Sequence, residues 1–167
     1  MTKHYLDNQE LSAKILNGIN KLADNVATTL GPKGRNVILF HRKQGLPVIT
    51  KDGVTVAKFV EFEDHFENVG AQIVKQAAEQ SASKAGDGTT TATVLTRAIL
   101  RQSQKYLSAG VSPIEIKRGM DKAATTIVDR LKEMATPIRS EQDIRHVATI
   151  SANNDKVIGT LISTAVD

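Results

Sequence analysis

Apolar residues recur every three or four positions over the first thirty residues of the chain. This spacing places them on one face of a helix and predicts an amphipathic helix, because 3.6 residues make one turn. Gly31-Pro32 follows the last of them and predicts the end of that helix. The members of the series are Leu11, Ile15, Ile19, Leu22, Val26 and Leu30.

Two short apolar runs come next, at residues 37–40 and 47–50, on either side of the polar turn HRKQG. Two such runs joined by a turn that contains glycine predict a β-hairpin. A two-stranded hairpin is barely stable by itself in water. We therefore expect it to pair with another part of the fold or with another chain.

The rest of the chain shows five further helical patterns. They span residues 64–84, 92–108, 113–135, 141–150 and 156–166. Breaks separate them at AGDGTTT, at Gly110, at Thr136-Pro137 and at SANND, and no period of 20–50 residues indicates a solenoid. The pattern predicts a mainly α fold with one small β element.

Length and composition narrow the function. The 167 residues suffice for one domain, or for one domain and part of another. The lack of Cys excludes disulfides, thiolate zinc sites and cysteine nucleophiles, and no two of the four His are four residues apart, as a helical metal site would need. No apolar run reaches the roughly 18–20 residues of a membrane span, so we expect a cytoplasmic protein that makes no membrane contact.

The net charge is +4 and the isoelectric point about 9.4, which raises the question of nucleic-acid binding. The charge is uneven, because residues 61–91 hold six acidic and two basic side chains. Only four Phe and two Tyr are present, and none lies within a basic cluster as a base-stacking surface requires. We therefore expect no nucleic-acid partner, a prediction that steeply salt-dependent filter binding would overturn.

The string Gly86-Asp87-Gly88-Thr89-Thr90-Thr91 is the strongest local signal, because it lies between two helical patterns. Glycines let the backbone approach a ligand, and the free N–H groups of the next helix, with threonine hydroxyls, suit a phosphate. Asp87 would repel that anion unless a cation such as Mg²⁺ lay between them. In isolation the string is more typical of a turn followed by a threonine N-cap than of a phosphate site.

Two other turns allow a structural and a functional interpretation. Leu30 to Arg35 forms a basic turn at a helix end, but it lacks the Gly-Lys-Ser/Thr of a P-loop and by itself indicates a helix stop. Asp52-Gly53 between apolar residues is typical of a hairpin turn. Beside a phosphate loop, Asp52 could instead orient a hydrolytic water.

Six strings occur together and in a fixed order. They are TLGPKGRNVIL (29–39), ITKDGVTVAK (49–58), FENVGAQIVK (66–75), AGDGTTTATVL (85–95), KRGMDKA (117–123) and TISANND (149–155). In this order they closely resemble the N-terminal part of a GroEL-type, group I chaperonin. The resemblance covers nearly the whole chain.

The resemblance implies a fold and a division into domains. Such chaperonins are ATP-driven folding machines, with an equatorial nucleotide-binding domain, an intermediate hinge domain and an apical client-binding domain. Residues 1–134 resemble the first half of the equatorial domain, an incomplete helical bundle with a β-hairpin as stem-loop. Residues 135–167 resemble the start of the intermediate domain, with a hinge around 151–155, and the apical domain is absent from the chain.

The resemblance also implies a site for ATP, Mg²⁺ and K⁺. Asp87 would hold Mg²⁺, and the backbone around Thr29 and Lys51 would help to hold K⁺. Asp52 would be one of two carboxylates that manage the attacking water, so the chain would turn into a short helix at Asp52-Gly53 and not into a hairpin. The implied nucleotide contacts are Thr29, Leu30, Gly31, Pro32, Lys51, Asp87, Gly88, Thr89, Thr90 and Thr91.

The partners implied are those of the family: a homo-oligomeric ring, a double ring of seven for a full-length subunit, a GroES-type co-chaperonin and non-native client proteins. The second catalytic carboxylate and the far wall of the adenine pocket would come from sequence beyond Asp167. The chain alone would thus hold half of an ATPase site, and the helical pattern that stops at Asp167 favours a piece of a longer subunit. The alternative is a truncated, non-enzymatic module that binds nucleotide weakly or assembles with other chaperonin subunits.

Overall fold

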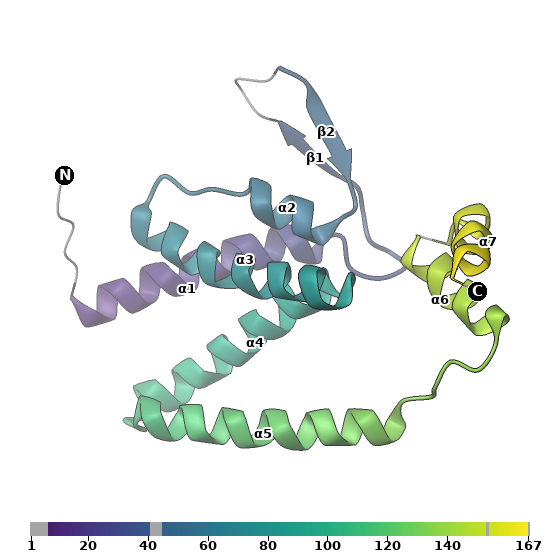
Figure 1. The fold of residues 1–167 in the computed structure, drawn as a ribbon. Coiled ribbons are helices and arrows are strands. Elements are labelled where there is room, and N and C mark those ends of the chain that lie inside the picture. The colour runs from purple at the N-terminus through teal and green to yellow at the C-terminus, as the bar shows by residue number, and fades with distance from the viewer. Residues whose placement is uncertain (1–6, 41–44, 153, 167) are drawn as a thin grey trace. The chain divides into compact units, whose positions relative to one another are not determined.

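The computed structural model describes residues 7–40, 45–152 and 154–166 (Figure 1). Within these ranges the fold is mainly α, with one two-stranded antiparallel sheet, as the hydrophobic pattern predicts. The elements are α1 (Asn8–Ala27), β1 (Val37–Phe40), β2 (Pro47–Thr50), α2 (Gly53–Phe59), α3 (His65–Ala85), α4 (Thr89–Ser108), α5 (Pro113–Met134), α6 (Glu141–Ser151) and α7 (Lys156–Ala165). They fall into two compact units, Met1–Val111 and Ser112–Asp167.

The first unit is built around α1. This helix packs against α2, α3 and α4, and Figure 1 shows α1 and α3 side by side. The apolar face predicted for α1 forms the centre of the core, because Leu22 and Val26 are fully buried there. Val56 of α2 and Val74 of α3 complete that centre and are also fully buried.

The hairpin forms with the predicted strands, in a register that pairs Val37 with Thr50 and Phe40 with Pro47. Among the side chains of β1, Leu39 alone is buried, and it joins the helical core. Ile38 and Ile49 are about two-thirds exposed. The turn residues 41–44, part of the predicted HRKQG turn, lie outside the described residues. The partner expected for this hairpin stays a prediction.

Two glycines allow α1 and α3 to touch through their backbones. A Cβ atom on Gly18 would lie 1.9 Å from the carbonyl oxygen of Glu67, and one on Gly70 would lie 2.1 Å from the carbonyl oxygen of Ile15. Real Cβ atoms do not approach other atoms so closely. The two helices can keep this separation only because both positions lack a side chain.

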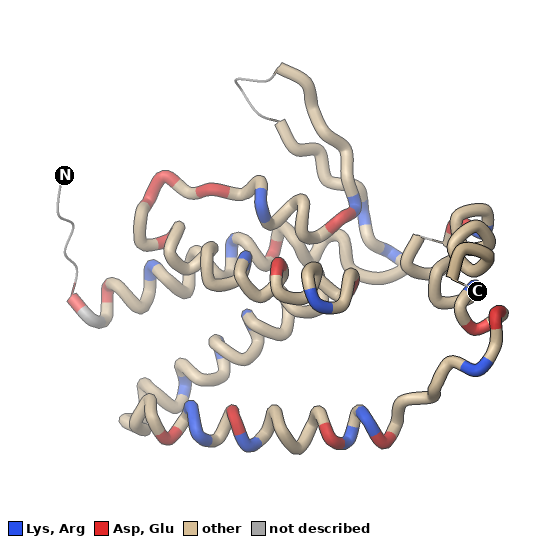
Figure 2. Tube along the Cα trace, viewed as in Figure 1, with Lys and Arg blue, Asp and Glu red and all other residues tan. Residues whose placement is uncertain are grey.

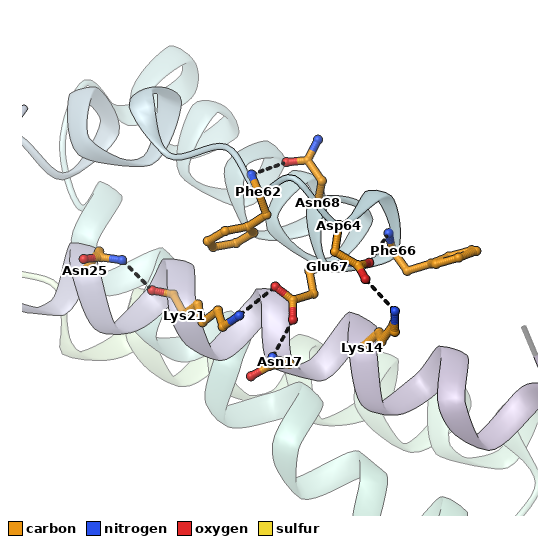
Figure 3. A network of polar contacts seen from close by, with 9 residues as sticks. All are labelled: Lys14, Asn17, Lys21, Asn25, Phe62, Asp64, Phe66, Glu67 and Asn68. Carbon is orange, nitrogen blue, oxygen red and sulfur yellow. Dashed lines mark hydrogen bonds and ion pairs between the residues drawn. The ribbon is translucent and has the colours of Figure 1, made fainter. Parts of the chain in front are cut away.

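A polar network fastens the start of α3 to α1 (Figure 3). The Asp64 carboxylate caps α3 by accepting hydrogen bonds from the backbone N–H groups of Phe66 and Glu67, at 2.9 and 3.1 Å. It also accepts a hydrogen bond from the Lys14 ammonium at 2.5 Å. Glu67 accepts from the Asn17 amide at 2.6 Å and forms an ion pair with Lys21 at 2.7 Å. Three interactions therefore join elements about fifty residues apart.

The network makes acid stability depend on Asp64. The Lys14 ammonium, helped by the N–H groups of α3, lowers the pKa of Asp64 from 3.8 to about 2. A carboxylate whose pKa is lowered by folding stabilises the fold above its unfolded pKa, and that stability is lost as the pH falls toward the folded pKa. We expect the thermal midpoint of the first unit to fall between about pH 5 and pH 2, and Asp64→Asn to flatten this dependence.

Asparagine also caps helices, so Asp64→Asn removes the charge and keeps the cap. Asp7→Asn at the N-cap of α1 is the matched control, since among the described residues Asp7 forms no ion pair. Calorimetry across the pH series measures both variants. An unchanged pH dependence in Asp64→Asn would show that the Lys14 contact does not contribute.

In the second unit, α6 and α7 form a helical pair. Ser140 and Asp143 build a capping box at the start of α6. Gly159 of α7 lies against Thr149 of α6, where a Cβ would come within 2.0 Å of the threonine hydroxyl. Asn154 adopts a left-handed φ of 67° in the connection. This connection coincides with the hinge implied for residues 151–155, whose role stays a prediction.

Helix α5 differs from the other helices of the chain because none of its side chains is buried. Ion pairs between successive turns cover its polar side, among them Lys117 with Asp121 and Arg130 with Glu133. The opposite side presents apolar side chains to solvent, including Ile127 at 58% exposure. The division into compact units places α5 with residues 112–167. The domain boundary after residue 134 is implied by the resemblance and stays a prediction.

Candidate functional site

Three segments that are far apart in the sequence meet in the first unit. They are the end of α1, the start of α2 and the start of α4. The hydroxyl oxygens of Thr29 and Thr90 lie 3.1 Å apart. Gly53 sits against the same threonine, because a Cβ on Gly53 would lie 2.2 Å from Thr90 Oγ1. The structure thus brings together the three motifs that the sequence marks for phosphate chemistry.

The loop after α1 is shaped by two glycines. Gly31 has a left-handed φ of 70°, and the N–H of Gly34 donates to its carbonyl oxygen at 2.9 Å. A Cβ on Gly34 would lie 2.3 Å from the carbonyl oxygen of Thr29, so the loop can close only on glycine. Leu30 and Pro32 are exposed on this loop. The predicted helix stop is confirmed, with α1 ending at Ala27, three residues before the last apolar position of its series.

Asp52 caps α2 and does not form a hairpin turn. Its carboxylate accepts hydrogen bonds from the N–H of Val54 at 3.3 Å and of Thr55 at 2.9 Å, and from the Thr55 hydroxyl. The interpretation of Asp52-Gly53 as a hairpin turn is therefore wrong, and the short helix implied by the resemblance is present. Asp52 is exposed at the junction of the three segments, and Lys51 is exposed beside it in sequence.

The GDGTTT string forms the loop between α3 and α4. Gly86 and Gly88 both adopt left-handed φ values, of 73° and 79°. The loop is held by Ser81, whose hydroxyl donates to the carbonyl oxygen of Asp87 at 2.7 Å. The N–H of Gly88 donates to the Asp87 carboxylate at 2.6 Å. Asp87 is thereby presented on the surface of the loop.

The start of α4 has free donors. Gly88 is its N-cap and, having no side chain, offers no acceptor to the first turn. The alternative prediction of a threonine N-cap is wrong, because Thr89, Thr90 and Thr91 lie inside the helix, which begins three residues earlier than its apolar pattern indicates. Thr89 and Thr90 are half-buried, whereas Thr91 is exposed. N–H groups of an uncapped first turn suit an anion.

The donor set fits a magnesium–phosphate complex better than a metal site built from protein alone. Among the described residues, no group of three or more His, Cys, Asp or Glu could hold a metal ion. Mg²⁺ is commonly held by one or two carboxylates together with the phosphates of a substrate. Asp87, exposed next to the open first turn of α4, can supply one such carboxylate.

Not every predicted residue touches another segment. Thr29 meets Thr90, and Gly53 lies against Thr90, whereas the described partners of the Asp52 carboxylate lie on α2 itself. The others, Leu30, Pro32, Lys51 and Thr91, lie on the same three segments in exposed positions. Ser81 was missed as a site residue, and it carries no signal in the sequence. The resemblance groups Gly53 with Asp52 in the site, and the structure places Gly53 against Thr90.

The comparison with protein families decides the identity. Residues 22–167 match the model of the TCP-1/cpn60 chaperonin family. The chain belongs to this family. The structure also matches a solved chaperonin, gp146 of bacteriophage EL 2 (Pseudomonas aeruginosa), crystallised in the presence of ATP-BeFx. That match has a TM-score of 0.77 and 26% sequence identity.

The match covers 94% of the 167-residue chain and 28% of the gp146 chain. The fold predicted from the sequence, a chaperonin-type helical bundle with a small hairpin, is confirmed. In the described ranges, no helix has the length and apolar character required to cross a bilayer. The chain spans little more than a quarter of the length of the chaperonin that it matches.

Proposed function

We propose that this chain forms the first half of the ATP-binding equatorial domain, and the start of the intermediate domain, of a GroEL-type, group I chaperonin subunit. The observation that carries the proposal is the meeting of three segments at Thr29, Gly53 and Thr90. The subunit would assemble into a ring, fold non-native client proteins and engage a GroES-type co-chaperonin. The family match and the gp146 structure, solved with ATP-BeFx, support this function.

In this proposal the first turn of α4 binds the phosphates of ATP. The N–H groups of Thr89 to Thr91 point out of an uncapped helix end, where the helix dipole favours negative charge. Gly86 and Gly88 keep side chains away from the ligand. The Thr29 hydroxyl donates to the Val26 carbonyl at 2.8 Å and accepts from the Thr90 hydroxyl, so this contact holds the loop after α1 against the first turn of α4. The N–H groups of α4 thus orient the phosphate chain before any chemistry occurs.

Two carboxylates then have different tasks. Asp87 would hold Mg²⁺, which when bound neutralises charge on the phosphate oxygens, and the backbone around Thr29 and Lys51 would hold K⁺. Asp52 would orient the attacking water and accept its proton. Its position is set by the cap that it makes at Val54 and Thr55, so the short helix α2 holds the carboxylate in place.

Substitution of one hydroxyl tests the site. Thr90→Val in the complete subunit keeps the shape of the side chain and removes its hydroxyl. We expect the affinity for MgATP to fall about fivefold, because the variant removes a neutral hydrogen bond worth about 1 kcal/mol that holds the loop after α1 against α4. Thr96→Val is the matched control, because Thr96 lies on the same helix and its hydroxyl donates to the Ala92 carbonyl at 2.8 Å. Equal losses in the two variants, measured by titration calorimetry, would contradict the proposed site.

A further inference from the structure

A polar hollow lies between α1 and α4, and none of its lining residues is among those assigned to the proposed ATP site. Its volume is about 570 Å³, within the range of sites that hold small molecules. Its lining comes almost entirely from one face of α4, with one contribution from α1. The lining residues are Asp24, Val94, Arg97, Ala98, Arg101, Gln102 and Lys105.

The hollow is positively charged. Arg97, Arg101 and Lys105 are four residues apart and therefore lie on successive turns of the same helix face. Helix α4 contains no Asp or Glu, and Figure 2 shows basic residues without acidic ones along it. Asp24 supplies the one carboxylate of the lining, so the hollow carries two net positive charges.

Interactions within the fold account for two of the three basic side chains of the hollow. Lys105 lies in the last turn of α4, where the helix dipole favours a cation. Arg97 is mostly buried, with 23% of its side chain exposed, and its guanidinium donates to the Asp24 carboxylate. Arg101, in contrast, forms no ion pair with any residue that the structure describes.

On helix α5, basic side chains form ion pairs with acidic side chains of the same helix. Lys117 pairs there with Asp121, and Arg118 pairs with Glu115, so charge is neutralised within the helix. Like charges four residues apart instead destabilise a helix by about 0.2–0.5 kcal/mol per pair. Arg101 and Lys105 on α4 form no ion pair with any residue that the structure describes, which indicates an anion that comes from outside the chain.

We propose that this hollow binds the phosphate dianion of a small phosphorylated molecule. Two negative charges balance the two net positive charges of the lining. The planar guanidinium of arginine matches phosphate oxygens with paired hydrogen bonds, and Arg97 is already held in position by Asp24. The Gln102 amide can donate a further hydrogen bond at the same surface.

Asp24, the lining residue that comes from α1, favours a compact anion over an acidic peptide as the ligand. A peptide with several carboxylates would extend across both helices and approach Asp24, whose side chain is 73% exposed and would repel it. A single phosphate can be held by Arg101 and Lys105, which lie one and two helical turns along α4 from the ion pair of Arg97 with Asp24. The hollow therefore suits one concentrated charge.

Inorganic phosphate is the probe for the first test. At pH 8 it is mostly a dianion, and amide chemical shifts of Ala98 and Gln102 in the ¹⁵N-labelled full chain report on this hollow separately from Thr89 to Thr91. We expect saturable shifts at Ala98 and Gln102, and a loss of about tenfold in affinity in Arg101→Gln. Arg118→Gln removes the same charge from α5 and should leave the titration unchanged.

An opposite variant strengthens the test. Asp24→Asn removes the competing carboxylate and should raise phosphate affinity about threefold or more, if one repulsive charge is lost near the surface. Equal titrations of Arg101→Gln and Arg118→Gln would overturn the proposal. So would tighter binding of a glutamate-rich peptide than of phosphate at the same amides, because the face would then be a protein-docking surface. Shifts confined to Thr89 to Thr91 would likewise overturn it and leave the proposed ATP site intact.

Discussion

Asp52→Asn in the complete subunit is expected to lower the rate of ATP hydrolysis by more than about a hundredfold while MgATP still binds. The reason is that removal of a general base costs 10²–10⁴ in rate, whereas the phosphates are held by α4 and not by Asp52. Asparagine is chosen because Asp52 also caps α2 through Val54 and Thr55. An alanine would remove the cap with the charge, at a cost of about 1 kcal/mol.

Steady-state hydrolysis and equilibrium binding of MgATP measure the two effects separately. Asp7→Asn makes the same chemical change at the N-cap of α1 and should hydrolyse ATP at the unaltered rate. Hydrolysis by Asp52→Asn at the wild-type rate would remove Asp52 from the mechanism. A parallel loss of binding and hydrolysis would mean that Asp52 holds the nucleotide and does not act on water.

Gly18→Ala is expected to destabilise the first unit by about 3 kcal/mol, the upper part of the range for overpacked cores. The added Cβ would meet the backbone carbonyl of Glu67 at 1.9 Å, and a carbonyl within α3 cannot rotate away as a side chain could. The helices must separate, which disturbs the packing of the core to which Leu22 and Val74 belong. Urea unfolding followed by circular dichroism gives the change in the free energy of unfolding.

The control is a second glycine, at which substitution by alanine is expected to stabilise the helix. Gly119 lies within α5, and a Cβ there would have no neighbour within 4 Å. Gly119→Ala should therefore stabilise its helix by about 0.5–1 kcal/mol, the ordinary gain of alanine over glycine. A stabilising Gly18→Ala would show that α1 and α3 are not held at backbone contact in solution.

Most of the helices and the hairpin could be predicted because each has a local signal in the sequence, either a periodic apolar pattern or a turn that bounds it. The strands at 37–40 and 47–50 are apolar runs with a polar turn, and α5 begins at Pro113 and ends before Thr136-Pro137. Helix α2 could not be found in this way. Its residues Val54, Thr55 and Val56 favour a strand, and burial of Val56 and Ala57 against α1 and α3 overrides that local preference.

The site was predictable in its parts and not in its geometry. The glycine and threonine motifs indicate phosphate chemistry by themselves, but no periodic pattern says that Thr29 and Thr90, 61 residues apart, share a contact. The resemblance supplied that grouping. The network of Lys14 with Asp64 was missed for the same physical reason, since an ion pair across fifty residues depends on how two helices cross.

The backbone contact at Gly18 and Gly70 also bears on how such chains diverge. Buried Leu22 or Val26 can be replaced by other apolar residues of similar volume as long as their neighbours adjust. No side chain can replace the hydrogen at the helix crossing. In distant homologues that keep this crossing, two glycines 52 positions apart should persist after the apolar residues around them have drifted. The two glycines would then be fixed positions for the alignment of sequences with low overall identity.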